Sequence, residues 1–526
     1  MKRIEIFDSM LRDGAQGEGV AFSVVDKLNI VKALDVFGVD YIEAGNPGSN
    51  PKDIEFFEQV HSLKLKHAKL CAFGSTCRKG STPEEDQNVQ SLMDAKTDVV
   101  VIFGKSWDLH VLKVLNTTLK ENLRLVKDTI AFFKAKGKEV IFDAEHFFDG
   151  YKENADFAMQ VLKAAAEAGA DCLVLCDTNG GTTPQRIGEV VGEVCKTIPG
   201  KRIGIHCHND IGCAVASSMS AVSAGAVQVQ GTFIGIGERC GNADLSTIIA
   251  NLKLKMGFEC AGNLEMLRDT AAKLSELCNM RLPRNEPYVG DSAFAHKGGM
   301  HIDGVSKVSR SFEHVPPESV GNSRRFLMSE VSGRTTVLAK IASIAPQLKK
   351  DSPEVTRIVE KTKELEHEGY QFESADASFE LMALKILGCF HPHFSLGMYR
   401  TSGEFPHPDE SQSASAMLSV QVGDVLEMTA AMGNGPVHAL DTALRKALSV
   451  FYPQLNDVRL VDYKVRVLTG KAATASRVRV LIESSDGEMD WTTTGVNTDI
   501  IAASWEALAD SIEYYLHHKE GTAKCP

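Results

Sequence analysis

Strand-like and helical segments alternate through the first half of the chain, and this alternation limits the fold more than any other feature. Short segments rich in Val, Ile and Leu are separated by amphipathic stretches of about a dozen residues, which is typical of parallel strands joined by helices. Eight such units in about 250 residues predict a closed (β/α)8 barrel. The predicted strands are 4–7, 41–43, 70–73, 99–103, 140–142, 172–176, 203–206 and 227–231.

The helix after the first strand carries clear boundary signals. Ser23 is a favourable N-cap residue, and Asp26 stands at the third helical position, where it can complete a capping box. Gly38 ends the helix, because glycine readily adopts the left-handed conformation found there. A doubly wound sheet is the alternative architecture for such alternating units, and we expect the barrel.

Composition divides the rest of the chain. We expect the catalytic barrel to cover residues 1–257 and a mainly helical central subdomain to cover 258–390. Within the latter, residues 296–304 contain two histidines, a lysine and three glycines, and we interpret them as a polar, lid-like loop. Residues 391–415 are rich in Pro, Ser, Gly and His without periodicity, and we interpret them as a linker.

Residues 416–526 have a different pattern. Apolar residues alternate along several segments, as expected for half-buried strands. Two similar helix starts, at Asn434 and Asn497, indicate a weak internal repeat of two strand–strand–helix units. We therefore predict a small α+β domain, which suits regulation or dimerisation.

The overall composition excludes several classes of protein. The 526 residues carry a net charge of −12, whereas a nucleic-acid-binding surface would be basic. No apolar run reaches the ~18 residues that a membrane span needs, and the first residues lack a signal-peptide pattern. The 12 cysteines are scattered without a CxxC pair, which indicates reduced thiols. We expect a cytoplasmic protein that binds neither nucleic acid nor membrane.

His206 and His208 are the sharpest local signal. Side chains two residues apart on a strand point the same way, so two imidazoles can converge on one metal ion. Asp13, after the first strand, is expected to face them, and Asn242 is a further oxygen donor. Such a mixed site suits Mg²⁺ or Mn²⁺, and also Zn²⁺. A hydrogen-bonded histidine pair and a turn asparagine are the alternatives.

Other reactive side chains follow predicted strands. Arg12 adjoins Asp13 and is either a solvated partner or a fixed cation near a developing oxyanion, which Glu43 could orient through a bidentate pair. Glu145 is either a base or an ordinary carboxylate of the barrel rim. His301 lies in the lid-like loop, which can also be read as a plain connection.

A glycine-rich loop follows the eighth strand. It contains Gly235, Gly237, Glu238 and Arg239 but lacks the third glycine and the βαβ context of a dinucleotide-binding fingerprint. Its place late in the barrel is one where phosphate-bearing ligands often bind.

Four ordered motifs together resemble the 2-isopropylmalate synthase, homocitrate synthase and citramalate synthase group. The first is Leu-Arg-Asp-Gly-Ala-Gln at 11–16, and the second combines 206–210 with 231–243. The third and fourth are the central motif at 295–304 and the pair 320–322 and 332–334. The C-terminal repeat resembles the regulatory dimerisation domain of the same enzymes, so the resemblance covers nearly the whole chain. It implies an acyltransferase that joins acetyl-CoA to a 2-oxo acid and then hydrolyses the thioester.

Three further segments, 17–19, 47–53 and 142–151, resemble the citramalate synthase branch. This implies pyruvate as the 2-oxo acid, (R)-citramalate and CoA as products, and a role in branched-chain amino-acid biosynthesis, leading to isoleucine by way of 2-oxobutanoate. It further implies a homodimer with isoleucine as an effector of the C-terminal domain. The main alternative is a 2-isopropylmalate synthase acting on 2-oxoisovalerate in leucine biosynthesis. A lyase of the same barrel type and a non-catalytic effector-binding protein are more distant alternatives.

The resemblance also implies residue roles. It implies that Asp13, His206 and His208 ligate the metal, with Asn242 as a fourth group. It implies that Arg12 and Thr178 contact the 2-oxo acid, with Glu43 beside them, and that Glu145 and His301 do acid–base work. Acetyl-CoA binding is implied for Gly235, Gly237, Glu238 and Arg239. Three positions depart from the pattern: Met10 replaces a threonine, Asn46 an aromatic residue and Phe312 a tyrosine. Methionine cannot replace a hydroxyl group, so we expect these changes to bear on substrate choice and turnover.

Overall fold

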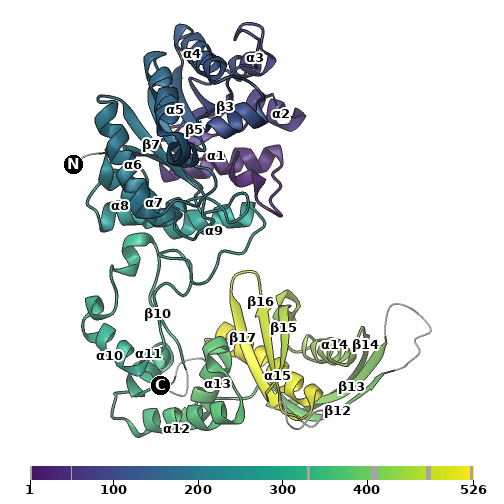
Figure 1. Ribbon diagram of the computed structural model, residues 1–526. Coiled ribbons are helices and arrows are strands. Elements are labelled where there is room, and N and C mark those ends of the chain that lie inside the picture. Colours follow the sequence, from purple (N-terminus) through teal and green to yellow (C-terminus); the bar gives the residue numbers. More distant parts are fainter. Residues whose placement is uncertain are drawn as a thin grey trace. The chain divides into compact units, whose positions relative to one another are not determined.

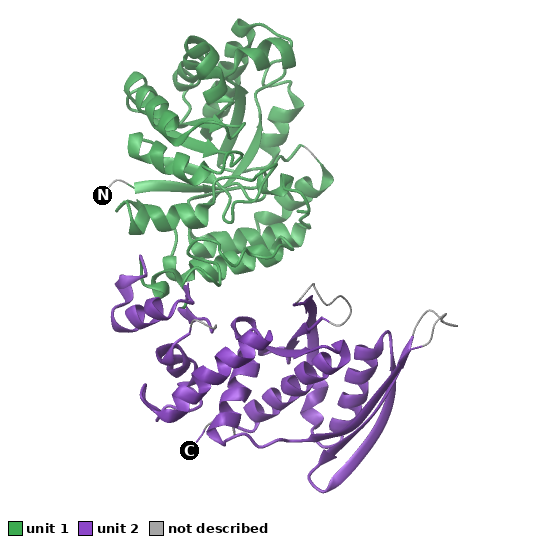
Figure 2. Cartoon of the chain, turned by 60° about the horizontal axis from the view of Figure 1, so that its bottom comes forward, with its two compact units in different colours: residues 1–294, 315–323 green, residues 295–314, 324–526 purple. Residues whose placement is uncertain are grey.

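A computed structural model describes residues 3–48, 50–328, 332–403, 413–468, 476–521 and 525. The chain forms two compact units, which Figure 2 distinguishes by colour. The first comprises residues up to 294 together with 315–323, and the second comprises 295–314 together with the residues from 324 onward.

The first unit contains a closed parallel barrel. Strand β1 pairs with both β2 and β8, so the ring has no open edge, which confirms the barrel and excludes the doubly wound sheet. All eight predicted strands are present, and a two-residue strand, β9 (Glu259–Cys260), also pairs with β1. The barrel strands are β1 (Arg3–Asp8), β2 (Tyr41–Glu43), β3 (Lys69–Ser75), β4 (Val99–Lys105), β5 (Glu139–Glu145), β6 (Cys172–Asp177), β7 (Arg202–Cys207) and β8 (Gln228–Gly231).

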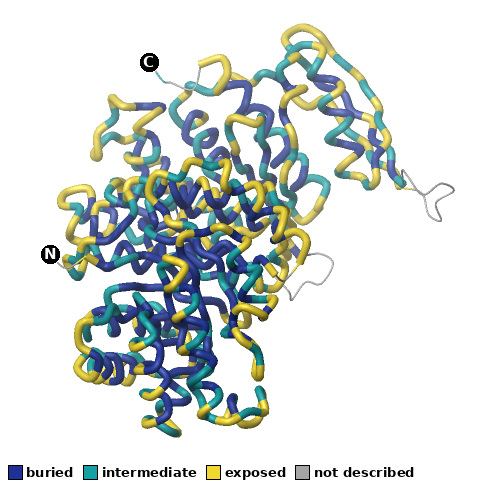
Figure 3. The backbone as a smooth tube through the Cα atoms, turned by 90° about the horizontal axis from the view of Figure 1, so that it is seen from above, coloured by how far each residue is buried: buried dark blue, intermediate teal, exposed yellow. Residues whose placement is uncertain are grey.

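Helices surround this barrel (Figure 1). They are α1 (Val24–Phe37), α2 (Pro51–Val60), α3 (Gln87–Asp94), α4 (Leu119–Ala135), α5 (Phe147–Glu167), α6 (Pro184–Thr197), α7 (Ala214–Ala224) and α8 (Leu245–Leu254). The capping box of Ser23 and Asp26 is present, and Gly38 ends α1 at φ +98°. Strands β2, β6 and β8 are buried along their whole length, and Figure 3 colours the chain by burial.

The barrel interior is filled by side chains that alternate along the strands with those facing the helices. One cluster contains Phe7, Tyr41, Val101, Ile141 and Val174. Because these apolar side chains fill the barrel interior, polar side chains can face a substrate only at the carboxyl ends of the strands.

The predicted helical central subdomain is largely confirmed. Its helices are α9 (Leu267–Leu277) in the first unit and α10 (Gly299–Lys307), α11 (Arg334–Ile341), α12 (Pro353–Glu368) and α13 (Asp376–Leu387) in the second. A short parallel pair, β10 (Ala295–His296) and β11 (Arg325–Phe326), lies among them. The prediction of a polar loop at 296–304 is wrong from Gly299 onward, because α10 begins there.

The C-terminal region consists of two similar repeats, each with three antiparallel strands and a helix. The first is β12 (Ser395–Gly403), β13 (Ala414–Val422), β14 (Val425–Gly433) and α14 (Pro436–Leu448). The second is β15 (Arg459–Val467), β16 (Val478–Ser485), β17 (Asp490–Asn497) and α15 (Ile500–Lys519). The prediction of an α+β domain is confirmed, although each repeat has one strand more than expected.

The predicted linker at 391–415 is wrong over Ser395–Gly403, which pairs with β13 as strand β12; residues 404–412 of that linker lie outside the described residues. The strand was missed because most of its side chains are exposed on both faces, which removes the apolar alternation. The expectation of reduced thiols is wrong at one pair, since Cys389 and Cys525 form a disulfide. Among the described residues, no helix combines the length and the apolar character required to cross a bilayer.

Candidate active site and metal centre

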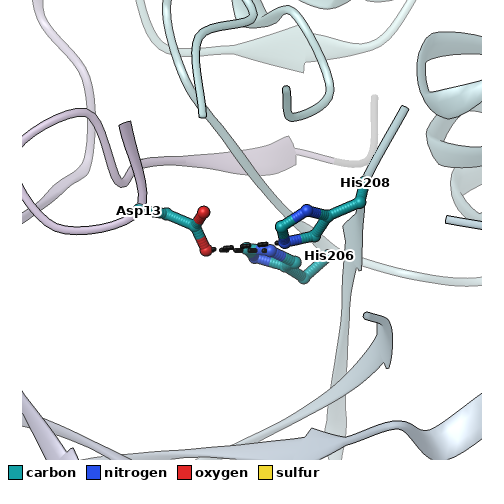
Figure 4. A group of neighbouring side chains, drawn as sticks. All are labelled: Asp13, His206 and His208. Carbon is teal, nitrogen blue, oxygen red and sulfur yellow. Dashed lines mark ion pairs between the residues drawn. The ribbon is translucent and has the colours of Figure 1, made fainter. Parts of the chain in front are cut away.

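Three ligand-type side chains meet at the carboxyl ends of the barrel strands. Asp13 follows β1, His206 lies on β7, and His208 follows β7 in an isolated bridge with Asn242. The Nε2 atoms of both histidines lie 3.6 Å from Asp13 Oδ2. Figure 4 shows the three side chains pointing toward one another. All three residues are buried. Burial raises the pKa of Asp13, but Arg12 and the two histidines lower it more, so the carboxyl ionises well below its ordinary range.

A neighbouring amide orients one of these imidazoles. His206 Nδ1 lies 3.1 Å from Gln230 Oε1, and Gln230 Nε2 donates to Asp143 Oδ1 at 3.1 Å. Because an amide oxygen only accepts, His206 carries its proton on Nδ1, and the lone pair of Nε2 faces Asp13. This is the protonation state that a metal-ligating imidazole requires.

Asn242 supplies a further oxygen atom to this group. Its Nδ2 donates to Asp13 Oδ1 and to Ile236 O, both at 3.1 Å, whereas its Oδ1 is buried and has no hydrogen-bond partner among the described residues. A buried oxygen without a partner is costly unless a ligand satisfies it. Two imidazole nitrogens, a carboxylate and this amide oxygen together fit a divalent cation.

Arg239 holds three strand ends together. Its guanidinium makes two hydrogen bonds to Asp210, at 2.8 and 2.9 Å, and one to Thr178 O at 2.8 Å. The hydrogen bonds from Arg239 lower the pKa of Asp210. The same Nη2 lies 3.1 Å from His208 Nδ1, but its two N–H bonds are directed to Asp210 and Thr178. Within the barrel, Arg239 is therefore engaged with protein groups.

The glycines of this loop have a local structural role. A Cβ atom at Gly237 would lie 2.2 Å from Asn242 Nδ2, and the residue has φ +159°. Gly235 has φ +72°, a conformation that glycine adopts without strain. Gly237 thus permits the close approach that positions Asn242. Glu238 contacts Arg239 at 3.2 Å.

Arg12 is fixed by two carboxylates and an aromatic ring. Its Nε donates to Glu43 Oε2 at 2.6 Å and its Nη1 to Asp13 Oδ2 at 2.8 Å, so Glu43 makes a single contact and not a bidentate pair. The guanidinium carbon lies 4.0 Å from the centre of the Phe73 ring. Burial lowers the pKa of Arg12, but Glu43 and Asp13 raise it by more, so the side chain remains a permanent cation.

Glu145 and Thr178 lie on the same rim. Glu145 ends β5, and its Oε2 forms an ion pair with Lys105 at the end of β4, the residue opposite it in the strand register. Thr178 Oγ1 accepts the backbone N–H of His146 at 2.9 Å. His146 itself has φ +55° and lies 3.1 Å from Asp149.

Several residues of the site were not predicted. Ser9 donates its hydroxyl to Glu43, while Phe73, Lys105, Asp143 and Gln230 contact the residues described above. Their only signal in the sequence was a position near a strand end, and the strand register was needed to select them.

His301 belongs to the second unit, where it lies exposed on α10. Its ring stacks on that of Phe312, with centroids 4.2 Å apart. Of the other two departures, Met10 is completely buried in the hydrophobic core. Asn46 Oδ1 accepts the Gly48 N–H in a turn.

Three family descriptions match successive parts of the chain. The HMGL-like family matches residues 3–281, the homocitrate synthase post-HMGL domain-like family residues 288–370, and the LeuA allosteric (dimerisation) domain residues 373–516.

Curated relatives match almost from end to end. An (R)-citramalate synthase of Geobacter sulfurreducens is 51% identical over 522 residues, and one of Aquifex aeolicus is 50% identical over 521 residues; both matches cover 99% of each chain. A probable 2-isopropylmalate synthase of Methanopyrus kandleri is 32% identical, over 97% of this chain and 98% of its own.

An HMGL-like barrel with a histidine–carboxylate centre, followed by a LeuA-type allosteric domain, defines an acyltransferase of the condensing class. The identities over nearly the full length narrow this class further. The chain belongs to the (R)-citramalate synthase family.

Proposed function

We propose that this protein condenses acetyl-CoA with pyruvate and hydrolyses the thioester, giving (R)-citramalate and CoA. The observation that carries the proposal is the 51% identity to an (R)-citramalate synthase over 99% of both chains, together with an intact histidine–carboxylate centre in the barrel. The role in isoleucine biosynthesis follows from that activity.

Asp13, His206, His208 and Asn242 would hold the divalent ion, which we propose to be Mg²⁺ or Mn²⁺, with Zn²⁺ as the further candidate. When bound, such an ion would supply Lewis-acid polarisation of the carbonyl group of a 2-oxo acid.

Arg12 supplies fixed positive charge to the keto oxygen of pyruvate, where negative charge develops as the new bond forms. Its contacts with Glu43, Asp13 and Phe73 hold the guanidinium in place before substrate binds, so little reorganisation is needed. The Thr178 hydroxyl oxygen accepts the N–H of His146. Its own hydrogen is therefore available to donate to the carboxylate of pyruvate.

Glu145 is our first candidate for the base. Lys105 engages its Oε2, which leaves Oε1 to accept a proton from the methyl group of acetyl-CoA. The resulting carbanion attacks the keto carbon of pyruvate, and water then cleaves the thioester with release of CoA. His301, on α10, is the second candidate for acid–base work in either step.

The loop containing Gly235, Gly237, Glu238 and Arg239 is proposed to contact acetyl-CoA. Because Arg239 is held by Asp210 in the barrel, we expect backbone N–H groups of the loop to make most of this contact. The LeuA-type domain is proposed to form the homodimer and to bind isoleucine as an effector. Use of acetyl-CoA and pyruvate favours a cytoplasmic location.

Release of CoA thiol tests the proposal. With Mn²⁺ or Mg²⁺ and acetyl-CoA, we expect a kcat/KM for pyruvate at least tenfold above that for 2-oxoisovalerate, a difference of about 1.4 kcal/mol. A preference for 2-oxoisovalerate would make the protein a 2-isopropylmalate synthase. That rival is favoured by the 32% identity to a probable enzyme of that kind.

The metal centre is tested separately. His206→Ala is expected to lose both bound metal and turnover, and His67→Ala, which changes an exposed histidine of the same unit, is expected to lose neither. Metal-independent turnover by His206→Ala would contradict the assigned site.

A further inference from the structure

A second group of buried histidine and carboxylate side chains lies outside the barrel, in the C-terminal region. Glu513 and His517 are one turn apart on α15 and therefore share a face of that helix. His393 comes from the segment between α13 and β12. Each of these side chains is at most 8% exposed. One ligand atom of each residue lies within 4.8 Å of the others.

Backbone N–H groups hold the Glu513 carboxylate in this group. Its Oε1 accepts the N–H groups of His393 at 3.0 Å and of Phe394 at 3.3 Å, and its Oε2 lies 2.7 Å from His393 Nδ1. The same Oε2 lies 3.9 Å from His517 Nε2. The two imidazole rings are 4.7 Å apart and nearly perpendicular, at 81°. Both rings thus meet at one carboxylate oxygen.

Carboxylates on both edges of the His393 ring favour a positive charge in this group, either a proton on the imidazole or a metal ion. Both ring nitrogens of His393 face carboxylates, since Nε2 lies 3.1 Å from Glu520 Oε2. A neutral imidazole carries one hydrogen, so its second nitrogen would direct a lone pair at a carboxylate unless a proton or a metal ion stands between them. Two carboxylates and two neutral imidazoles carry a charge that one divalent ion balances.

We propose that His393, through Nδ1, together with Glu513 and His517 binds a zinc ion, while Glu520 accepts the hydrogen on Nε2 of His393. This ion fastens the C-terminal helix to the segment leading into β12. Imidazole nitrogen and carboxylate oxygen are ordinary zinc ligands. A cavity of about 990 Å³ beside the group, lined in part by His391, His393, His517 and Glu520, gives an ion access from solvent.

Zinc content of the full-length chain tests this proposal. The barrel centre is first removed with His206→Ala and His208→Ala, so that only the second group can respond. After equilibrium dialysis against Zn²⁺ near neutral pH, this barrel-deficient chain is expected to retain one zinc ion, and adding His517→Gln is expected to abolish retention. The matched control is His518→Ala, which removes the adjacent, exposed histidine of α15 and is expected to leave the ion bound.

Glu513→Gln guards against misfolding of the histidine variant, because glutamine keeps an oxygen to accept the two backbone N–H groups. It too is expected to abolish retention. As a further readout, Co²⁺ added to the barrel-deficient chain is expected to give visible absorption typical of a tetrahedral nitrogen and oxygen site. Absence of zinc from the barrel-deficient chain, as when a proton occupies the group, overturns the proposal. Zinc retention in His517→Gln or Glu513→Gln that equals retention in the barrel-deficient parent overturns it as well. None of these readouts depends on condensing activity.

Discussion

The ring of His301 stacks on the ring of Phe312, with centroids 4.2 Å apart and planes inclined by 23°. Both side chains are exposed, and the stack holds the imidazole ring against Phe312. We expect Phe312→Ala to lower kcat about two- to tenfold, the effect of losing an aromatic contact worth about 0.5–1.5 kcal/mol. Phe312→Tyr keeps the stack and is expected to retain at least the native kcat. A native rate in Phe312→Ala would exclude a positioning role, and His301→Ala provides the reference.

Replacing Gln230 separates orientation of a ligand from ligation itself. Gln230→Leu removes the acceptor that holds the proton of His206 on Nδ1. We expect the affinity for Mn²⁺ to fall about 10- to 100-fold, as is usual when such a partner is lost. Gln228→Leu is the matched control, since Gln228 is equally buried on β8 but contacts Glu5 and Cys172. Equal losses in both variants, measured by titration calorimetry, would indicate a general effect on the barrel.

Arg12→Lys tests the fixed cation. A lysine ammonium cannot contact Glu43 and Asp13 together while lying flat on Phe73. We expect kcat/KM for pyruvate to fall about 100- to 1,000-fold, with most of the loss in kcat. Arg202→Lys changes an arginine at the opposite ends of the strands, where it pairs with Glu5 and Glu139, and should lower the melting temperature without this kinetic effect. A change in KM alone would show that Arg12 contributes only to substrate binding.

The barrel interior predicts a pH-dependent stability for the metal-free protein. Burial, assisted by the negative charge of Glu43, raises the pKa of Asp143 to about 8. The folded state therefore holds a proton that the unfolded state releases near its ordinary pKa, so this contribution to stability is lost as pH rises from about 4 through about 8. Asp143→Asn keeps an acceptor for Gln230 and should flatten the dependence. Melting temperatures of the chelator-treated proteins between pH 5 and about 9 decide the matter; parallel curves would contradict it.

The sequence allowed the barrel to be predicted because each of its strands is buried on both faces and appears as a nearly continuous apolar run. The same rule fails for β12, whose side chains are mostly exposed, and for the start of α10, where Gly298 and Gly299 suggested a loop. The cluster of Asp13, His206 and His208 was predictable from the spacing of the two histidines and the position of Asp13 after the first strand. Lys105 and Gln230 were not, because their partners are set by strand register and not by neighbours in sequence. The Cys389–Cys525 bridge, with a separation of 136 residues, left no pattern at all.

The pairing of β1 with β8 also has a consequence for the growing chain. The hydrogen bond from Asn242 to Asp13 joins residues 229 positions apart, and Gln230, which orients His206, lies on the strand that completes the ring. Contacts of such long range form late, because the entropy cost of closing the intervening loop comes before the contacts contribute any stabilisation. A nascent chain that still lacks β8 therefore holds Asp13 and His206 without the partners that set their geometry. At the proposed metal site, binding of an ion would therefore follow closure of the barrel ring.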